Sequence, residues 1–231
     1  SITSSVSANT TAGFSIVSYT GTGSAGTIGH GLGATPSMIL VKNRSTSANW
    51  MIWHQSLNLS DGQFMEFNNK VLQSSGTAVW DVSEMSSTNI GIGSNGDSNG
   101  SGNNLIAYCF AEKKGYSKFG KYIGNNNDDG AFVYTGFKPA FLLIKLIDTQ
   151  TDNWIMQDNK INTFNSATSQ RLRANSSGAE FSSSNEIDLL SNGFKVHGAD
   201  GEINGSGSTY IYMAFAEAPF VSSGGVPTTA R

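Results

Sequence analysis

The residues best suited to catalysis in this chain are its three histidines and its scattered carboxylates. His30 stands between glycines in Gly29–Gly33, which indicates a sharp turn. His54 and His197 have no further ligand residue at a metal-binding spacing. Four carboxylates could supply a pair for sugar cleavage: Asp81, Glu84, Glu186 and Asp188. Any all-β protein offers such pairs by chance, so we expect no enzymatic activity, no catalytic residues and no cofactor.

The tryptophans suggest a binding site instead of a catalytic one. Trp53 and Trp80 have no counterpart elsewhere in the chain, and the amides Asn49 and Gln55 lie near Trp53 in the sequence. An exposed tryptophan beside amide groups can stack against a sugar ring. These four residues are therefore our candidate glycan contacts. The alternative is that both rings are buried against a sheet. Trp50 recurs as Trp154, which favours a core position for that pair.

Two loops place oxygen-bearing side chains at alternate positions, as calcium-binding loops do. They are Asn95–Gly100 and Asp200–Gly205. The twelfth position, where such a loop needs a bidentate carboxylate, is Ile106 in the first and Ile211 in the second. We therefore expect hairpin turns held by side-chain-to-backbone hydrogen bonds, and no metal site.

The composition limits the range of partners. The chain has 231 residues, a net charge of −3 and only 13% charged residues, and it has no basic stripe that would attract nucleic acid. No apolar run approaches the roughly 20 residues that span a bilayer. A single cysteine, Cys109, lies in the apolar run Leu105–Phe110. Intrachain disulfides are therefore impossible, and we expect a buried thiol.

Short β-type runs separated by Gly, Asn, Ser and Asp dominate the chain. The expected strands are Phe14–Tyr19, Met38–Lys42, Asn49–His54, Phe64–Phe67, Leu105–Phe110, Ala131–Tyr134, Ala140–Ile147, Asn153–Met156, Phe194–His197 and Tyr210–Phe215. The last run carries apolar residues on both faces, as a strand inside a sandwich does. One helical turn is expected within Thr163–Arg173. The pattern predicts an all-β, jelly-roll-like sandwich fold.

The chain also repeats itself. Pro36–Glu112 recurs as Pro139–Glu217, at an offset of 103 residues at the start and 105 at the end. Such a drift is what loop insertions produce in a duplicated fold. We therefore predict two β-sandwich repeats, packed together, with flexible arms at both ends. The predicted boundaries are 1–12 for the N-terminal arm, 13–114 and 115–220 for the repeats, and 221–231 for the C-terminal arm.

Five phrases of the chain carry a resemblance to a known family. They are Ala8–Val17, Gly29–Gly33, Gly115–Tyr122, Phe132–Pro139 and Ala214–Glu217. Together they resemble a module of structural proteins in marine tailed phages. In that family the module often follows a lectin-like sandwich in long tail or appendage proteins. The resemblance brings no catalytic residues with it.

The first hypothesis is a non-enzymatic virion protein, a fibre, tail or capsid-surface component. It would be assembled in the host cytoplasm and lie on the virion surface. Its expected partners are further copies of itself, as a trimer or a lattice, and other virion proteins. Neither nucleic acid nor a membrane is expected as a partner. The second hypothesis is a carbohydrate-binding adhesin that contacts a host surface glycan, and the third is a glycosidase that depolymerises one.

Overall fold

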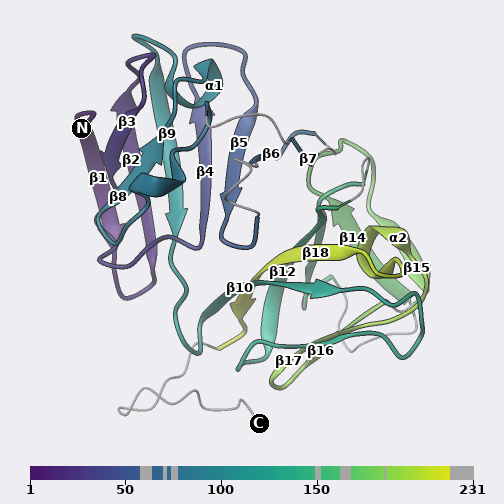
Figure 1. Cartoon of the computed structure of the whole chain (residues 1–231). Coiled ribbons are helices and arrows are strands. Elements are labelled where there is room, and N and C mark those ends of the chain that lie inside the picture. Colours follow the sequence, from purple (N-terminus) through teal and green to yellow (C-terminus); the bar gives the residue numbers. More distant parts are fainter. Residues whose placement is uncertain are drawn as a thin grey trace. The chain divides into compact units, whose positions relative to one another are not determined.

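The computed structural model describes residues 1–57, 64–69, 72–73, 78–148, 152–161, 168–184 and 186–218. The chain forms two compact units, Ser1–Glu112 and Lys113–Arg231 (Figure 1). Strands dominate both units, and the helices among the described residues are single turns. The predicted all-β fold is confirmed. None of the helices in the described ranges is long and apolar enough to cross a membrane.

Unit 1 is built from a large and a small antiparallel sheet. The large sheet has the order β1-β2-β9-β4-β5-β6-β7, and the small one pairs β3 with β8. The elements are β1 (Ser4–Asn9), β2 (Phe14–Thr20), β3 (Gly26–Gly29), β4 (Met38–Asn43), β5 (Trp50–His54), β6 (Phe64–Glu66), β7 (Leu72–Gln73), η2 (Val82–Glu84), β8 (Asn89–Ile92), α1 (Gly96–Asn99) and β9 (Asn104–Phe110).

The core of unit 1 lies between its two sheets. Alternate residues of the large sheet, such as Val17, Val41 and Ala107, pack with Ile28 and Ile90 of the small sheet. All five are fully buried. Because successive side chains of a strand point to opposite faces, the residues between them form a second face of the large sheet, turned away from this core.

Unit 2 has the same two-layer construction. Its large sheet has the order β10-β18-β12-β13-β14-β15, and its small sheet has the order β11-β17-β16. The elements are β10 (Ser117–Ile123), β11 (Phe132–Tyr134), β12 (Pro139–Leu146), β13 (Ile155–Asp158), β14 (Thr168–Arg173), β15 (Phe181–Ser184), β16 (Ile187–Leu190), β17 (Gly193–Val196), α2 (Gly201–Asn204) and β18 (Thr209–Ala216). Ile144, Tyr210 and Tyr212 of the large sheet pack with Phe194 and Val196 of the small one.

Two predicted segments differ from the structure. The N-terminal arm is wrong for Ser4–Asn9, because these residues pair with β2 along their whole length and form an edge strand of unit 1. The helical turn within Thr163–Arg173 is wrong for Thr168–Arg173, which is strand β14. Five of its six residues are polar, so the strand lacks the alternation of apolar and polar residues by which a strand is recognised in a sequence. The rest of that turn and the predicted C-terminal arm, 221–231, lie outside the described residues.

The two calcium-like loops form single helical turns, where hairpins were predicted. α1 begins after Asn95 and α2 after Asp200. The side-chain oxygens of these two residues accept hydrogen bonds from Asp97 N and Glu202 N, each at 2.8 Å. Such caps satisfy backbone N–H groups that a helix start leaves free. The oxygens that resembled calcium ligands therefore serve as helix caps.

Each helical turn ends in a fully buried asparagine, Asn99 or Asn204. The Asn99 amide donates to the carbonyls of Ser24 and Gly93, both at 2.7 Å, and its Oδ1 accepts from Thr22 N at 2.8 Å. The matching three hydrogen bonds of Asn204 are 3.1 Å to Asn127 O, 2.7 Å to Gly198 O and 3.0 Å from Asn125 N. One asparagine in each unit thus ties together the helical turn and two loops.

Glycine is required where β2 of unit 1 and β10 of unit 2 each meet this turn. A Cβ on Gly21 would lie 2.3 Å from Gly100 O, and a Cβ on Gly124 would lie 2.5 Å from Gly205 O. Both distances are shorter than a side chain allows. The two units therefore use the same close backbone approach at matched positions.

Candidate functional site

The predicted glycan contacts do not form a site. Trp53 and Trp80 are only 3% and 1% exposed, in the core of unit 1. β5 directs Trp53 toward the small sheet, and Trp80 forms a bridge to Ile92 of β8. Asn49 and Gln55 lie at opposite ends of β5, which at about 3.4 Å per residue spans about 17 Å. The prediction of sugar stacking on these two rings is therefore wrong.

The histidines have structural partners. His30 is fully buried, its Nδ1 accepts from Leu32 N at 3.2 Å, and its Nε2 lies 3.2 Å from Ser86 O. Burial lowers the pKa of His30 below its usual value, and the contact with Ser86 opposes this shift. The Nδ1 of His54 accepts from Ser56 N at 3.1 Å. Both rings therefore help to shape turns.

Three of the four carboxylates considered for sugar cleavage have partners, and within the described residues the side chain of Glu84 on η2 is not brought together with them. Glu186 forms an ion pair with Arg171, and Asp188 lies 2.9 Å from His197 Nε2. Asp81 accepts from Ser83 Oγ at 2.6 Å. A carboxylate held by a cation is poorly placed to act as a general acid. Among the described residues, no group of three or more His, Cys, Asp or Glu side chains could hold a metal ion.

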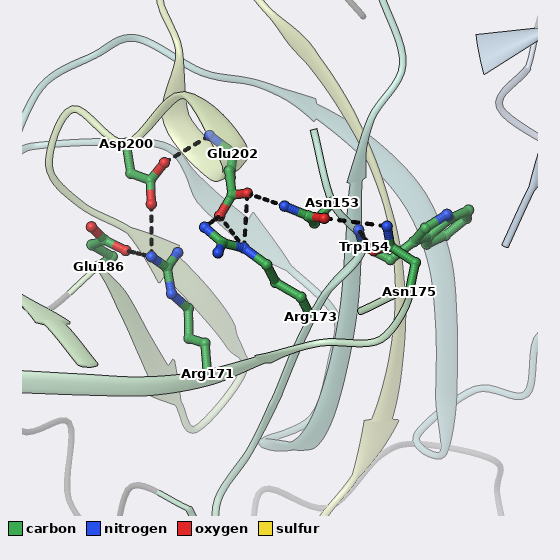
Figure 2. A network of polar contacts seen from close by, with 8 residues as sticks. All are labelled: Asn153, Trp154, Arg171, Arg173, Asn175, Glu186, Asp200 and Glu202. Atoms are coloured by element: carbon green, nitrogen blue, oxygen red, sulfur yellow. Dashed lines mark hydrogen bonds and ion pairs between the residues drawn. The ribbon is translucent and has the colours of Figure 1, made fainter. Parts of the chain in front are cut away.

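Unit 2 contains a polar network that the sequence did not reveal (Figure 2). Arg171 is 1% exposed, and its Nη2 contacts both Glu186 and Asp200, the latter at 2.7 Å. Asp200 is also the residue that caps α2. Figure 2 shows both carboxylates reaching the same nitrogen of the Arg171 guanidinium. Because Arg171 lies on β14 and Asp200 caps α2, this contact ties α2 to the sheet.

A second chain of contacts leads from α2 to a tryptophan (Figure 2). Glu202 pairs with Arg173 at 3.0 Å and accepts from the Asn153 amide at 2.7 Å. Asn175 donates to Asn153 Oδ1 at 3.2 Å and accepts from Trp154 N at 2.8 Å. This chain fixes the backbone at the residue that precedes β13.

The same chain of contacts recurs in unit 1. Asp97 accepts from Asn49 N at 3.3 Å, Asn68 donates to Asn49 Oδ1 at 2.7 Å, and Asn68 accepts from Trp50 N at 3.0 Å. Asn49 thus has a backbone-positioning role, in place of the glycan contact predicted for it. These hydrogen bonds fix the position of Trp50 at the start of β5.

Trp50 belongs to a row of aromatic rings on the second face of the large sheet of unit 1, which we call the outer face. The Trp50 and Tyr108 rings are stacked with centroids 6.1 Å apart, Tyr108 and Phe14 are 6.5 Å apart, and Phe14 and Phe110 are 4.9 Å apart. The Lys42 Nζ lies 5.8 Å from the Trp50 centroid. All five side chains are half-buried. Each ring therefore keeps some surface for a ligand.

A pocket of about 470 Å³ lies at one end of this sheet. Its lining is rich in hydroxyl groups and consists of Thr3, Ser4, Ser5, Ser18, Tyr19, Thr20, Arg44, Asn104 and Leu105. The pocket thus offers small polar donors and acceptors and one cation. A few placed polar groups of this kind give a binding site its orientation and specificity.

The pocket and the aromatic row share the outer face. Ser18 lies opposite Ile106, Ile106 opposite Lys42, and Lys42 opposite Trp50. Directly opposite residues of antiparallel strands lie on the same side of the sheet. Neighbouring strands are about 4.8 Å apart, so the three steps from β2 to β5 span about 15 Å. The two features together form an extended surface, longer than one sugar ring.

A family model described as a domain of unknown function, DUF7483, matches residues 1–219. The chain belongs to this family. Because the match runs through both units, a DUF7483 domain comprises the two sandwiches together. Searches of the curated proteins and of the solved structures find no match to the chain.

The sequence analysis of the DUF7483 chain missed the outer face because it selected Trp53, which is buried, and not Trp50, which is half-buried. Trp50 and Trp53 are three residues apart, so they point to opposite faces of β5. The recurrence of Trp50 as Trp154 favours a core position for the pair, which is confirmed for the buried Trp154 and wrong for the half-buried Trp50. Tyr108 offered a usable signal, since it alternates with the small core residues Ala107 and Cys109 on β9.

Proposed function

We propose that this DUF7483 chain is a non-catalytic binding module that holds a saccharide on the outer face of unit 1. The observation that carries the proposal is the half-buried aromatic row, which shares a face with a hydroxyl-lined pocket. Aromatic rings offer flat apolar surface to the C–H face of a sugar. Hydroxyl and amide groups complement the hydroxyls around its edge.

The lining of the pocket favours binding over cleavage. Its residues include five Ser and Thr hydroxyls, one amide and one guanidinium, and no carboxylate. Hydrolysis of a glycosidic bond ordinarily needs two carboxyl groups, about 5 to 10 Å apart, on either side of the bond. A saccharide on this surface would meet groups that orient it and none that would protonate its glycosidic oxygen.

Trp50→Ala tests this function. A glycan array followed by calorimetry with the bound oligosaccharides should give at least a tenfold loss of affinity, since the variant removes the largest ring of the row. Trp50→Phe should retain part of the affinity. Tyr134→Ala is the matched control, because Tyr134 is 63% exposed and lies in unit 2. Unchanged affinity in Trp50→Ala, or no glycan bound by the native chain, would contradict the proposal.

A structural role on a phage particle is the second candidate function, and one observation favours it. β1 is an edge strand of its sheet, and Ser5–Asn9 within it are exposed and uncharged. An exposed edge strand without charge can pair with another chain. Together with the resemblance to phage structural modules, this supports a homo-oligomer built through sheet edges on a virion surface.

Sedimentation of the native chain and of Ser7→Lys tests the second candidate. Ser7 lies on β1 opposite Ile16, and a lysine at an edge disfavours pairing with another strand. We expect a discrete oligomer that becomes monomeric in the variant, while Ser182→Lys on β15, one edge strand of the large sheet of unit 2, leaves it unchanged. A native chain that is monomeric at all concentrations would rule this assembly out.

We also propose that the two units are copies of one ancestral unit. The support comes from matched contacts at matched places. Asn99 and Asn204 make three corresponding hydrogen bonds, and the chain from α1 to Trp50 has its counterpart from α2 to Trp154. An experimental structure in which these contacts differ between the units would contradict the proposal.

A further inference from the structure

Arg44 gives the pocket a positive charge that no carboxylate among the described residues of unit 1 pairs with. It is the single charged residue of the lining and it is exposed. Within the described part of the chain, no carboxylate forms an ion pair with its guanidinium. A guanidinium presents a planar set of donors that matches a carboxylate or sulfate group. An anionic group on the ligand is the natural partner of such a side chain.

The backbone around Arg44 is fixed from both sides. Arg44 N donates to Asn104 O at 2.8 Å, and Asn104 N donates to Ser45 Oγ at 2.8 Å. Asn43, which is 1% exposed, accepts from Ser45 N at 2.9 Å and donates to Gly96 O at 3.1 Å. The guanidinium therefore extends from a rigid base beside the pocket, which reduces the entropy lost on binding.

The five strands that carry the pocket and the aromatic row have no acidic residue. These strands, β1, β2, β4, β5 and β9, include Lys42, although the chain carries 17 acidic against 14 basic residues. With Arg44 at its end, the outer face holds two cations about two residues apart on the chain. An anionic ligand would meet attraction at Arg44 and Lys42, and no like charge along the strands.

We infer that the ligand of the outer face is an anionic oligosaccharide, with a carboxylate or sulfate group held at Arg44 and a sugar ring on Trp50. This inference rests on the proposed saccharide-binding function and specifies its ligand class. A ligand that spans the outer face from β2 to β5, about 15 Å, is longer than one sugar ring. The acidic group is placed in the hydroxyl-lined pocket, and the apolar sugar face is placed on the aromatic row.

Two pairs of matched ligands test the inference by calorimetry. The first pair is a hexamer of galacturonic acid and the same hexamer with its carboxyl groups reduced. The second is a sulfated galactan hexasaccharide and its desulfated form. In at least one pair the native chain should bind the acidic member about tenfold more tightly than the neutral one. This preference should decrease as the salt concentration rises.

The variants separate the charge from the platform. Arg44→Gln should remove the preference for the acidic member, whereas Trp50→Ala should weaken the binding of both members. Lys121→Gln, an exposed lysine of unit 2, is the matched control and should change neither. Equal affinity for acidic and neutral members, or an unchanged preference in Arg44→Gln, would overturn the inference and leave the proposed function standing. If no member of either pair binds, both fail.

Discussion

One region of the core differs in chemistry between the units, and we call it the corner. It holds the apolar Phe64 and Val79 in unit 1 and the ion pair of Arg171 and Glu186 in unit 2. Phe64 and Arg171 take the same place in the sheet, because Glu66 pairs with Met51 as Arg173 pairs with Ile155. Val79 and Glu186 likewise accept matching backbone hydrogen bonds, from Gly93 and His197. Phe64 and Val79 belong to the apolar core, whereas Arg171 and Glu186 form a buried ion pair.

The cap residue changes together with this corner. Asn95 caps α1 as a neutral amide, and Asp200 caps α2 as a carboxylate that also contacts Arg171. Both turns begin after a capping side chain and end in a buried asparagine. The comparison teaches that the capped turn and its buried asparagine define the fold, while the chemistry of the neighbouring corner can vary. The corner residues and the cap can change only together, because a buried charge that loses its partner is strongly destabilising.

The largest effect on stability should come from removing one charge of the buried ion-pair cluster. Arg171→Leu should lower the free energy of unfolding of unit 2 by about 3–5 kcal/mol, because Glu186, only 7% exposed on its side chain, loses its cation. Hydrogen exchange of unit 2 amides in the full chain measures this change. Arg173→Leu is the control, since Arg173 is 40% exposed and should cost under about 1 kcal/mol. Equal costs for the two variants would show that burial of the cluster is unimportant.

The second-largest effect on stability should come from removing the buried asparagine that both units share. Asn99→Ala and Asn204→Ala each remove three hydrogen bonds to backbone groups, and should each cost about 2–3 kcal/mol in their own unit. Urea denaturation with exchange measured separately in each unit gives both values. A large cost in one unit and none in the other would contradict a common framework.

The third effect is a difference between the units in how their stability depends on pH. His30 Nδ1 accepts from Leu32 N, and Thr135 Oγ1 accepts from Phe137 N in the matched turn of unit 2. The pKa of His30 is lowered by burial, so below about pH 6.5 the unfolded state takes up a proton that the folded state does not. This contribution to stability is complete above pH 6.5 and is lost as the pH falls. His30→Thr should make unit 1 less sensitive to acid, by up to about 1.4 kcal/mol per pH unit.

The exchange rates of unit 1 amides at pH 7 and pH 5 measure this difference. His197→Asn serves as the control, because it changes an exposed contact of unit 2 and should leave the acid sensitivity of unit 1 intact. If His30→Thr and the native chain lose the same stability on acidification, His30 is not the group responsible.

The smallest effect should come from the complete exchange. The triple variant Arg171→Phe, Glu186→Val and Asp200→Asn introduces the residues of unit 1 into unit 2 and keeps a capping side chain on α2. Replacing a buried ion cluster by packed apolar residues is often neutral or stabilising, so we expect a change within about 1 kcal/mol. A loss as large as that of Arg171→Leu would mean that the two corners are not interchangeable.

Much of the strand pattern was predictable from the sequence. Runs such as Phe14–Tyr19 and Leu105–Phe110 alternate or are continuously apolar; the first stops before Gly21 and the second begins after Asn104. The helical turns were not predictable, because four residues cannot show a helical period and their stability comes from caps. β14 was mistaken for a helical turn because its residues are polar. Arg171 gave no sign of burial, since its partners Glu186 and Asp200 follow at 15 and 29 residues.

The amino-acid sequence alone determined that this chain is all-β, where most of its strands lie, and which turns need glycine. These properties depend on neighbouring residues and on the two-residue period of a strand. The tertiary structure alone decided that Trp53 is buried while Trp50 lies on the outer face, and that Arg171 is surrounded by carboxylates. Alternation separates the two faces of a strand without saying which one meets the other sheet. That choice depends on contacts between residues far apart in the chain.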